Sequence, residues 1–214
     1  MRKLNNWQAG QFLEKYKTTQ NEKVLEIGAG ASGGWVKFFP NMTTLDIAEE
    51  KRPDVVGDVH SLPFEDATYD VIVCSEAYEH FYNPFVATAE IFRVLKPGGL
   101  LLVTTRFMFP VHDAPHDYFR FTPYGMRELF KDFEITGEGV ESDVFTTIAI
   151  LLQRIMFQTK LRGGKVTKGL LYLLALFINK LDRLVINRYG DIKRDEVVPV
   201  LMATGVFLAC RKPR

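Results

Sequence analysis

Five short apolar runs recur along the first 105 residues, and each has the length and composition of a β-strand. They occupy residues 23–28, 42–47, 53–59, 69–77 and 100–105. The fourth run is apolar at consecutive positions, which is typical of a strand covered on both faces of a sheet. Segments with helical spacing separate the runs, and this alternation predicts a doubly wound, mostly parallel α/β sheet.

The helical segments carry recognisable start signals. Residues 1–20 are expected to form an entry helix, and the segment 32–39 opens another directly after the first strand. Asn83-Pro84 and Thr122-Pro123 each combine a capping side chain with a proline suited to the first helical turn. In the helix after Asn83, the apolar positions Phe85, Ile91, Val94 and Leu95 are expected to make one stripe.

The regular alternation ends after about residue 144. Residues 144–157 and 168–187 are helical by pattern, and a basic link containing two glycines joins them. Residues 202–212 then predict a last strand. We therefore expect a core over 1–144 with its N-terminal helix, an apolar helical insertion or lid over 145–200, and a final strand at 201–214 that returns to the sheet.

Composition and charge are those of a globular protein with an uneven charge distribution. The chain has 214 residues, of which 47% are hydrophobic and 25% charged. Residues 1–150 hold 14 Lys and Arg against 22 Asp and Glu, whereas residues 151–214 hold 13 against 4. The basic third either faces an anionic surface or is an ordinary solvated helix face.

Cys74 and Cys210 lie in predicted buried strands without metal-ligand spacing, and the start of the chain lacks the apolar core of a signal peptide. We expect a cytoplasmic protein, with peripheral contact to the inner face of a membrane left open.

A glycine-rich loop follows the first predicted strand, and its electrostatic surroundings are informative. Residues 28–33 match G-x-G-x-x-G, a pattern that alone is a weak sign of dinucleotide binding. However, Glu26 precedes the loop, and Asp58 and Glu76 end two later strands. These acids would repel a pyrophosphate, but they would attract the cationic sulfonium and amino group of S-adenosylmethionine.

Four ordered segments resemble the class I S-adenosylmethionine-dependent methyltransferases, specifically the small-molecule "type 11" group. They are VLEIGAG at 24–30, LDI at 45–47, the run 57–81 ending in SEAYEHF, and IFRVLKPGGLLLVTT at 91–105. The resemblance implies a Rossmann-like sheet of seven strands with an antiparallel last strand beside the fifth. It also implies S-adenosylmethionine as the cofactor. One departure is Ser32, which stands where a third glycine is common.

The resemblance carries roles over to seven residues of the cofactor site. Gly28 and Gly30 look like the loop under the methionine and ribose portions, and Glu26 resembles the acid that orients the loop and the amino group. Asp46 is similar to the ligand of the ribose hydroxyls. Asp58 and Val59 match the positions that bind adenine, and Ser75 should lie beside the methionine moiety. Asp46 and Asp58 could instead be simple turn residues, and Glu76 and Glu79 could be solvated or helix-capping.

Candidate groups for the acceptor side cluster after the fifth strand, in residues 106–125. His112 and His116 are candidates for a catalytic base or a substrate hydrogen-bonder, because imidazole titrates near neutral pH. Satisfied structural histidines are the alternative. No metal site is expected, because Pro110 and Pro115 prevent one helix from presenting both histidines. His80 is expected to pack behind the fourth strand. The run HDYFRFTP at 116–123 also resembles bacterial methyltransferases encoded among cell-surface polysaccharide functions.

The sequence therefore predicts methyl transfer from S-adenosylmethionine to a small or lipid-linked acceptor, at oxygen. A non-enzymatic S-adenosylmethionine-binding or assembly subunit, and a nicotinamide-dependent oxidoreductase, are the alternatives. No nucleic acid is expected as a partner, because the fourth strand is not followed by an Asn/Asp-Pro-Pro-aromatic run. The apolar positions of the second inserted helix, among them Leu170, Leu173 and Phe177, leave three options for residues 145–190: an internal lid, a homodimer interface or a membrane-surface contact.

Overall fold

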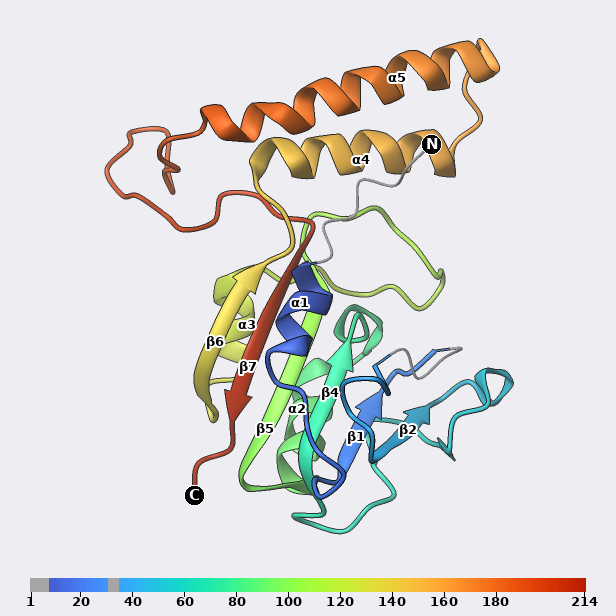
Figure 1. Cartoon of the computed structure of the whole chain (residues 1–214), viewed down its shortest axis with the longest axis vertical. Helices are drawn as coiled ribbons and strands as arrows, with labels where there is room; N and C mark the ends of the chain where they lie inside the picture. Colours follow the sequence, from blue (N-terminus) through green and yellow to red (C-terminus); the bar gives the residue numbers. More distant parts are fainter. Residues whose placement is uncertain (1–7, 31–34) are drawn as a thin grey trace.

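A seven-stranded mixed sheet forms the centre of the computed structural model, which describes residues 8–30 and 35–214 (Figure 1). The strand order is β3-β2-β1-β4-β5-β7-β6. The strands β1 to β5 are parallel to one another, and β7 is antiparallel to both β5 and β6. The strands are β1 (Val24–Ile27), β2 (Met42–Asp46), β3 (Val55–Val56), β4 (Tyr69–Ser75), β5 (Leu95–Arg106), β6 (Glu134–Val140) and β7 (Gly205–Arg211). The predicted seven-stranded, mostly parallel sheet with an antiparallel last strand is confirmed.

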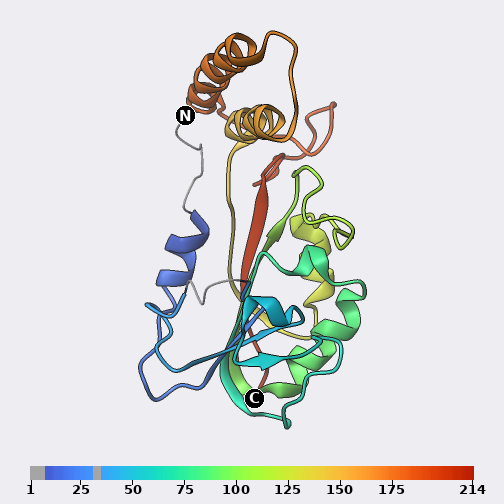
Figure 2. The same ribbon diagram turned by 90° about the vertical axis from the view of Figure 1, so that its right-hand side faces the viewer.

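The central strands are apolar on both faces because each face is covered. In β4, Ile72 and Cys74 belong to the core cluster under the helices α2 (Pro84–Val94) and α3 (Pro123–Leu129). Val71 and Val73 point the other way, into a second cluster with residues of α1 (Gln8–Glu14). Figure 2 shows α1 on one side of the sheet and α2 and α3 on the other. This two-sided burial explains the unbroken apolar run of β4.

Both predicted helix starts form as expected. The Asn83 side chain accepts a hydrogen bond from the Val86 N–H at 3.3 Å, and the Thr122 side chain accepts one from the Gly125 N–H at 3.0 Å. The predicted stripe on α2 was wrong at Phe85, which is 68% exposed. The buried positions of α2 are spaced by three or four residues and exclude Phe85; they are Pro84, Ala87, Thr88, Ile91 and Val94.

Three other elements differ from the sequence expectation. The strand β6 was not located, because it pairs only with β7 at the sheet edge and alternates exposed with half-buried residues, which gives little apolar signal. The entry helix α1 is shorter than the predicted 1–20, and residues 1–7 lie outside the described part. After β1, residues 35–38 form only turns, whereas Ser32 and Gly33 also lie outside the described residues.

The insertion before β7 is a helical hairpin. The helices α4 (Val144–Gln158) and α5 (Gly164–Asn179) lie side by side across the edge at which the parallel strands end (Figure 1). A short 3-10 helix, η3 (Lys180–Leu184), follows, and its Asp182 accepts hydrogen bonds from the N–H groups of Phe145 and Thr146 at 2.8 and 2.7 Å. Asp182 thus caps the first turn of α4 from a distant part of the chain.

The outer face of α5 stays exposed. Ala175 is the buried residue of this helix, whereas Leu170, Leu173 and Phe177 are 65%, 62% and 63% exposed. Among residues 8–30 and 35–214, no helix has the length and apolar character needed to cross a bilayer.

Candidate active site

The carboxyl ends of β1, β2 and β4 meet at one edge of the sheet. Ile27 is in register with Leu45 on one side and Cys74 on the other, so the residues that follow these positions, Gly28, Asp46 and Ser75, lie close together. The strand order reverses between β1 and β4. In doubly wound sheets this reversal opens the crevice in which ligands bind.

The glycine loop adopts a conformation that favours glycine at both predicted positions. Gly28 and Gly30 have φ angles of +72° and +60°. The Gly30 N–H donates to Asp46 Oδ2 at 2.9 Å, and the Ala48 N–H donates to Asp46 Oδ1 at 2.9 Å. Each carboxylate oxygen retains a second lone pair, so Asp46 could hold the loop and still accept two ribose hydroxyls. Ser32, which stands where a third glycine is common in the family, lies outside the described residues.

Asp58, Val59 and Ser75 lie at the same edge. Asp58 Oδ1 accepts from the His60 N–H at 2.9 Å and also contacts His60 Nδ1. Burial raises the pKa of Asp58, but these hydrogen bonds outweigh it and the net pKa is lowered. Val59 is buried, and the Ser75 hydroxyl lies 3.1 Å from Thr104 Oγ1. Asp58 is therefore a carboxylate at neutral pH, able to accept from an amino group.

Glu26 is a buried acid within β1. It is 3% exposed, and its Oε2 atom has no hydrogen-bond partner among the residues described. Burial raises the pKa of Glu26 to about 7. An approaching cation would favour the ionised form, so this side chain would gain most from a positively charged ligand.

Glu76 does not contribute a free negative charge to the crevice, contrary to the electrostatic expectation. It forms an ion pair with Arg106 at the end of β5, and Arg106 NH1 also donates to Glu141 Oε2 at 2.7 Å. Burial raises the pKa of Glu76, and Arg106 opposes that shift. Of the acids expected at these strand ends, Glu26, Asp46 and Asp58 thus remain the candidates for contact with a ligand.

Asp117 and Arg120 hold the loop after β5 in place. Arg120 forms a bidentate ion pair with the Asp117 carboxylate, with both N···O distances at 2.6 Å, and donates to the Pro110 carbonyl at 3.0 Å. The Asp117 side chain is 2% exposed, and it also accepts from the His112 N–H at 2.9 Å. These contacts explain much of the HDYFRF run as loop structure.

The two predicted histidines lie in different surroundings. The His112 side chain is 20% exposed, and its Nε2 lies 3.9 Å from Glu79 Oε1. His116 is exposed, and its Nδ1 lies 3.0 Å from the Tyr118 hydroxyl. The structure therefore brings only His112 to the acids that follow β4.

Two further residues lie near His112. His80 was expected behind the fourth strand, but its ring packs against His112 with centroids 4.9 Å apart. Glu79 lies in the 3-10 helix η2 (Tyr78–His80) and is fully buried, rather than solvated or capping. The sequence signal that could have indicated a buried Glu79 is its position shortly after the apolar run of β4.

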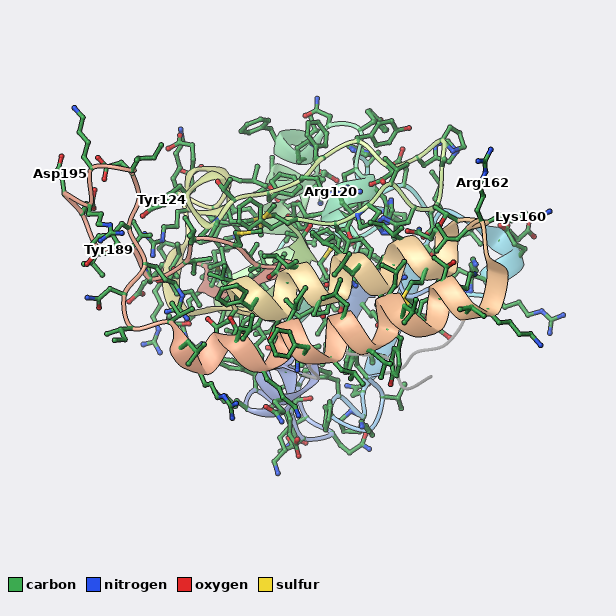
Figure 3. The ribbon with its side chains drawn as sticks, turned by 90° about the horizontal axis from the view of Figure 1, so that it is seen from above. Arg120, Tyr124, Lys160, Arg162, Tyr189 and Asp195 are labelled. Atoms are coloured by element: carbon green, nitrogen blue, oxygen red, sulfur yellow. The ribbon has the colours of Figure 1, made fainter. Side chains whose placement is uncertain are left out.

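The helix α4 covers this loop. The Arg154 guanidinium lies 4.5 Å from the centre of the Phe109 ring, and Arg106 lies 4.3 Å from the same ring. Gln158 Nε2 donates to the Val111 carbonyl at 3.4 Å. In Figure 3, viewed from above, Arg120 lies beside the α4–α5 hairpin, in the layer beneath it. The hairpin is thus anchored to the segment that presents His112.

A cavity of about 430 Å³ lies at the opposite edge of the sheet. It is lined by Asp70 at the start of β4, by Lys96 and Gly98 in the first part of β5, and by Tyr16. Because ligands of doubly wound sheets bind at the carboxyl ends of the strands, this cavity is separate from the candidate site.

Residues 25–103 match the family model of the type 11 group, which is described as a methyltransferase domain. Together with the fold, this match supports a class I S-adenosylmethionine-dependent methyltransferase with S-adenosylmethionine as cofactor. The nicotinamide-dependent alternative is thereby set aside.

Relatives with assigned names support the family. An uncharacterised methyltransferase of Bacillus subtilis, YcgJ, is 31% identical over 126 residues, which cover 50% of this chain and 47% of that protein. A malonyl-acyl-carrier-protein O-methyltransferase of Erwinia billingiae is 29% identical and covers 54% and 55%, respectively. The chain spans about half the length of the curated relatives it matches.

Solved structures agree on the fold. The crystal structure of B. subtilis YcgJ superimposes with a TM-score of 0.57 at 17% identity, over 96% of this chain and 98% of that one. The cyclase SpnF superimposes with a TM-score of 0.59 at 17% identity, over 96% and 80%. At such identities, the likeness establishes architecture and not substrate.

Proposed function

We propose that this protein transfers the methyl group of S-adenosylmethionine to a hydroxyl oxygen of a small or lipid-linked acceptor. The observation that carries the donor half is Glu26, a buried carboxyl group close to the glycine loop, one oxygen of which has no hydrogen-bond partner in the described part of the chain. A cationic ligand would stabilise the ionised form of this group, whereas a pyrophosphate would repel it. In this assignment, Gly28 and Gly30 let the cofactor approach the loop backbone closely, and Asp46 binds the ribose hydroxyls.

Residues at the same edge of the sheet are assigned to the adenine ring and to the acceptor. Asp58 would accept from the adenine amino group, the Val59 N–H would donate to the ring, and Ser75 would lie beside the methionine moiety. We assign the contact with an acceptor hydroxyl to His112, since His116 is exposed and lies against Tyr118. Most of the rate gain in an in-line methyl transfer can come from alignment of the two reactants. A subunit that binds the donor without an acceptor remains the alternative.

The donor assignment predicts proton release on binding. With its pKa at about 7, Glu26 is about half protonated at pH 7 in the free protein, and a bound cation should ionise it fully, releasing about half a proton. Because binding releases a proton, affinity should rise as the pH passes upward through 7. Calorimetry with S-adenosylmethionine in two buffers of different ionisation enthalpy measures this release.

Glu26→Gln is the matched control, since it keeps the shape of the side chain and removes the titration. The difference between wild type and Glu26→Gln subtracts the ligand's own proton equilibria. Equal proton release in the two proteins would remove Glu26 from the donor site. Binding of NADH in place of S-adenosylmethionine would contradict the whole donor assignment.

A lipid-linked acceptor is supported by the surface of the α4–α5 hairpin. The exposed apolar side chains of α5 recur every three or four residues, so they form one stripe: Val166, Leu170, Leu173, Leu174 and Phe177. Residues 151–190 contain eight Lys and Arg and one acid, Asp182, which is occupied in capping α4. Figure 3 shows Lys160 and Arg162 projecting outward at the turn of the hairpin. Apolar side chains flanked by basic ones suit an anionic membrane surface.

We expect the protein to bind vesicles of phosphatidylcholine mixed with phosphatidylglycerol more tightly than vesicles of phosphatidylcholine alone. Leu170→Glu/Phe177→Glu should lower that affinity at least about tenfold, because two side chains lose apolar burial and two negative charges are added. Sedimentation with vesicles measures the bound fraction, which should also fall as salt rises from about 0.1 to about 0.5 M.

Phe85→Glu makes the same kind of change at a similarly exposed position on α2 and should leave vesicle binding unchanged. Concentration-dependent dimerisation that the α5 double variant abolishes, with no vesicle binding, would instead assign the stripe to a homodimer. With labelled S-adenosylmethionine, the lipid proposal expects the methyl group in the organic-solvent extract. Label confined to water-soluble hydroxyl compounds would contradict it.

A further inference from the structure

One glutamate and two histidines converge at the end of β4, beside the proposed acceptor position. Glu79 and His80 come from η2, and His112 comes from the loop after β5. One ligand atom from each residue lies within 4.8 Å of the other two. Ligands of a bound Zn²⁺ lie about 2 Å from the ion, hence roughly 3.3 Å apart, so small rotations of the half-buried histidines would close the set.

The Glu79 carboxylate is incompletely satisfied. Glu79 is fully buried, and its Oε2 accepts from the Thr105 hydroxyl at 2.7 Å. Its Oε1 has no hydrogen-bond partner in the described part of the chain. Arg106 Nε and His112 Nε2 lie 4.0 and 3.9 Å from it, too far for a hydrogen bond. A buried carboxylate oxygen in this condition is costly unless a ligand occupies it.

Both histidines are oriented as metal ligands usually are. The His80 Nδ1–H donates to the His116 carbonyl at 2.6 Å. His112 Nδ1 faces the Pro110 carbonyl at 3.3 Å and Asp117 Oδ2 at 3.5 Å. With each Nδ1 directed to an oxygen acceptor, the lone pair is on Nε2, and such outer contacts fix the tautomer of metal-binding imidazoles.

We propose that Glu79, His80 and His112 bind a divalent transition-metal ion of the Zn²⁺ or Mn²⁺ kind. Two imidazoles and one carboxylate suit such ions, and three protein ligands leave coordination positions open, as in catalytic rather than structural sites. The sequence expectation of no metal rested on Pro110 and Pro115, which argue against one helix that presents both His112 and His116. The set assembled here replaces His116 with His80 and Glu79.

The consequence for chemistry rests on the proposed function. An acceptor hydroxyl bound to the ion would lose its proton to solvent at neutral pH more readily. The resulting oxygen would form a bond to the methyl carbon while the carbon–sulfur bond breaks. The sulfonium sulfur keeps that electron pair and becomes a neutral thioether. The products are a methyl ether, S-adenosylhomocysteine and one released proton, and no oxidant or reductant is required.

Metal binding can be measured without turnover. Protein stripped with a chelator is dialysed against Zn²⁺ or Mn²⁺, and bound metal is quantified by mass spectrometry; Co²⁺ then reports ligand geometry through its visible absorption. We expect one ion per chain. His80→Ala, His112→Ala and Glu79→Gln should each weaken binding at least about tenfold, by loss of one ligand.

His116→Ala is the matched control, because it removes an exposed imidazole but keeps the backbone carbonyl that orients His80. It should retain one ion. Failure of the wild type to bind either ion, or equal binding by His112→Ala, would overturn the proposal and leave the cluster as an ion-pair network. Because Glu79→Gln could impair folding, the two half-buried histidines decide the test. Calorimetry with S-adenosylmethionine is a separate readout, so loss of the metal proposal and loss of the proposed function are distinguishable.

Discussion

Gly28→Ala is expected to lower the free energy of unfolding by roughly 2–5 kcal/mol. A Cβ atom at this position would lie 2.6 Å from the Ala77 Cβ, and the φ angle of +72° is costly for any residue with a side chain. The left-handed conformation accounts for about 1–2 kcal/mol and overpacking for about 1–3 kcal/mol. Urea denaturation measures the change, and calorimetry should show weakened binding of S-adenosylmethionine because the same loop faces the crevice.

Gly30→Ala provides the control that separates the two terms. Its φ of +60° is similar, but an added Cβ would meet no atom of the described residues within 4 Å, so we expect a loss of only about 1–2 kcal/mol. Adding Ala77→Gly to Gly28→Ala removes the clashing atom and should restore part of the stability despite its own cost. A Gly28→Ala protein as stable as Gly30→Ala would show that the packing against Ala77 is not tight.

Apolar patterning predicted the sheet because the central strands are buried on both sides. In β1, β4 and β5, buried apolar residues face both sides of the sheet, and the prolines at 84 and 123 marked the helix starts. The same reasoning failed at β6, whose outward residues include Glu134, Thr136 and Glu138. An edge strand buries too little apolar surface for the alternation of apolar and polar residues to be recognisable in a single sequence.

Candidate site residues could be proposed from sequence where they follow a strand end, but not where their arrangement depends on loop geometry. Asp46 and Asp58 were located by their positions after apolar runs. The separation of His112 from His116, and the approach of His80 to His112, depend on how residues 107–121 fold back on η2. That path is set by contacts across many residues, such as the Tyr118 N–H donating to the Glu79 carbonyl at 2.9 Å. No spacing rule reports such contacts.

Asp117→Asn is expected to cost about 2.5 kcal/mol at pH 7 and to disorganise the segment that presents His112. The hydrogen bonds from Arg120, opposed by burial, lower the pKa of Asp117 from 3.8 to about 2. A depressed pKa stabilises the folded state above the unfolded value of 3.8, and this contribution is lost as pH falls through about 2. The stability difference between wild type and variant should therefore be full at pH 7 and shrink below about pH 4. Denaturation series at several pH values test this.

The effect of Asp117→Asn on function distinguishes a role in positioning His112 from a role in binding S-adenosylmethionine. Asp117 accepts from the His112 N–H and pairs with the Arg120 guanidinium, and among the described residues none of its hydrogen bonds involves Gly28, Gly30 or Asp46. Turnover should fall on the order of 100-fold through misplacement of His112, while affinity for S-adenosylmethionine stays near the wild-type value. Asp113→Asn removes the same charge at an exposed position four residues earlier and should change stability by less than about 0.5 kcal/mol. Equal effects of the two substitutions would mean that charge in this loop matters, rather than the buried Asp117–Arg120 pair.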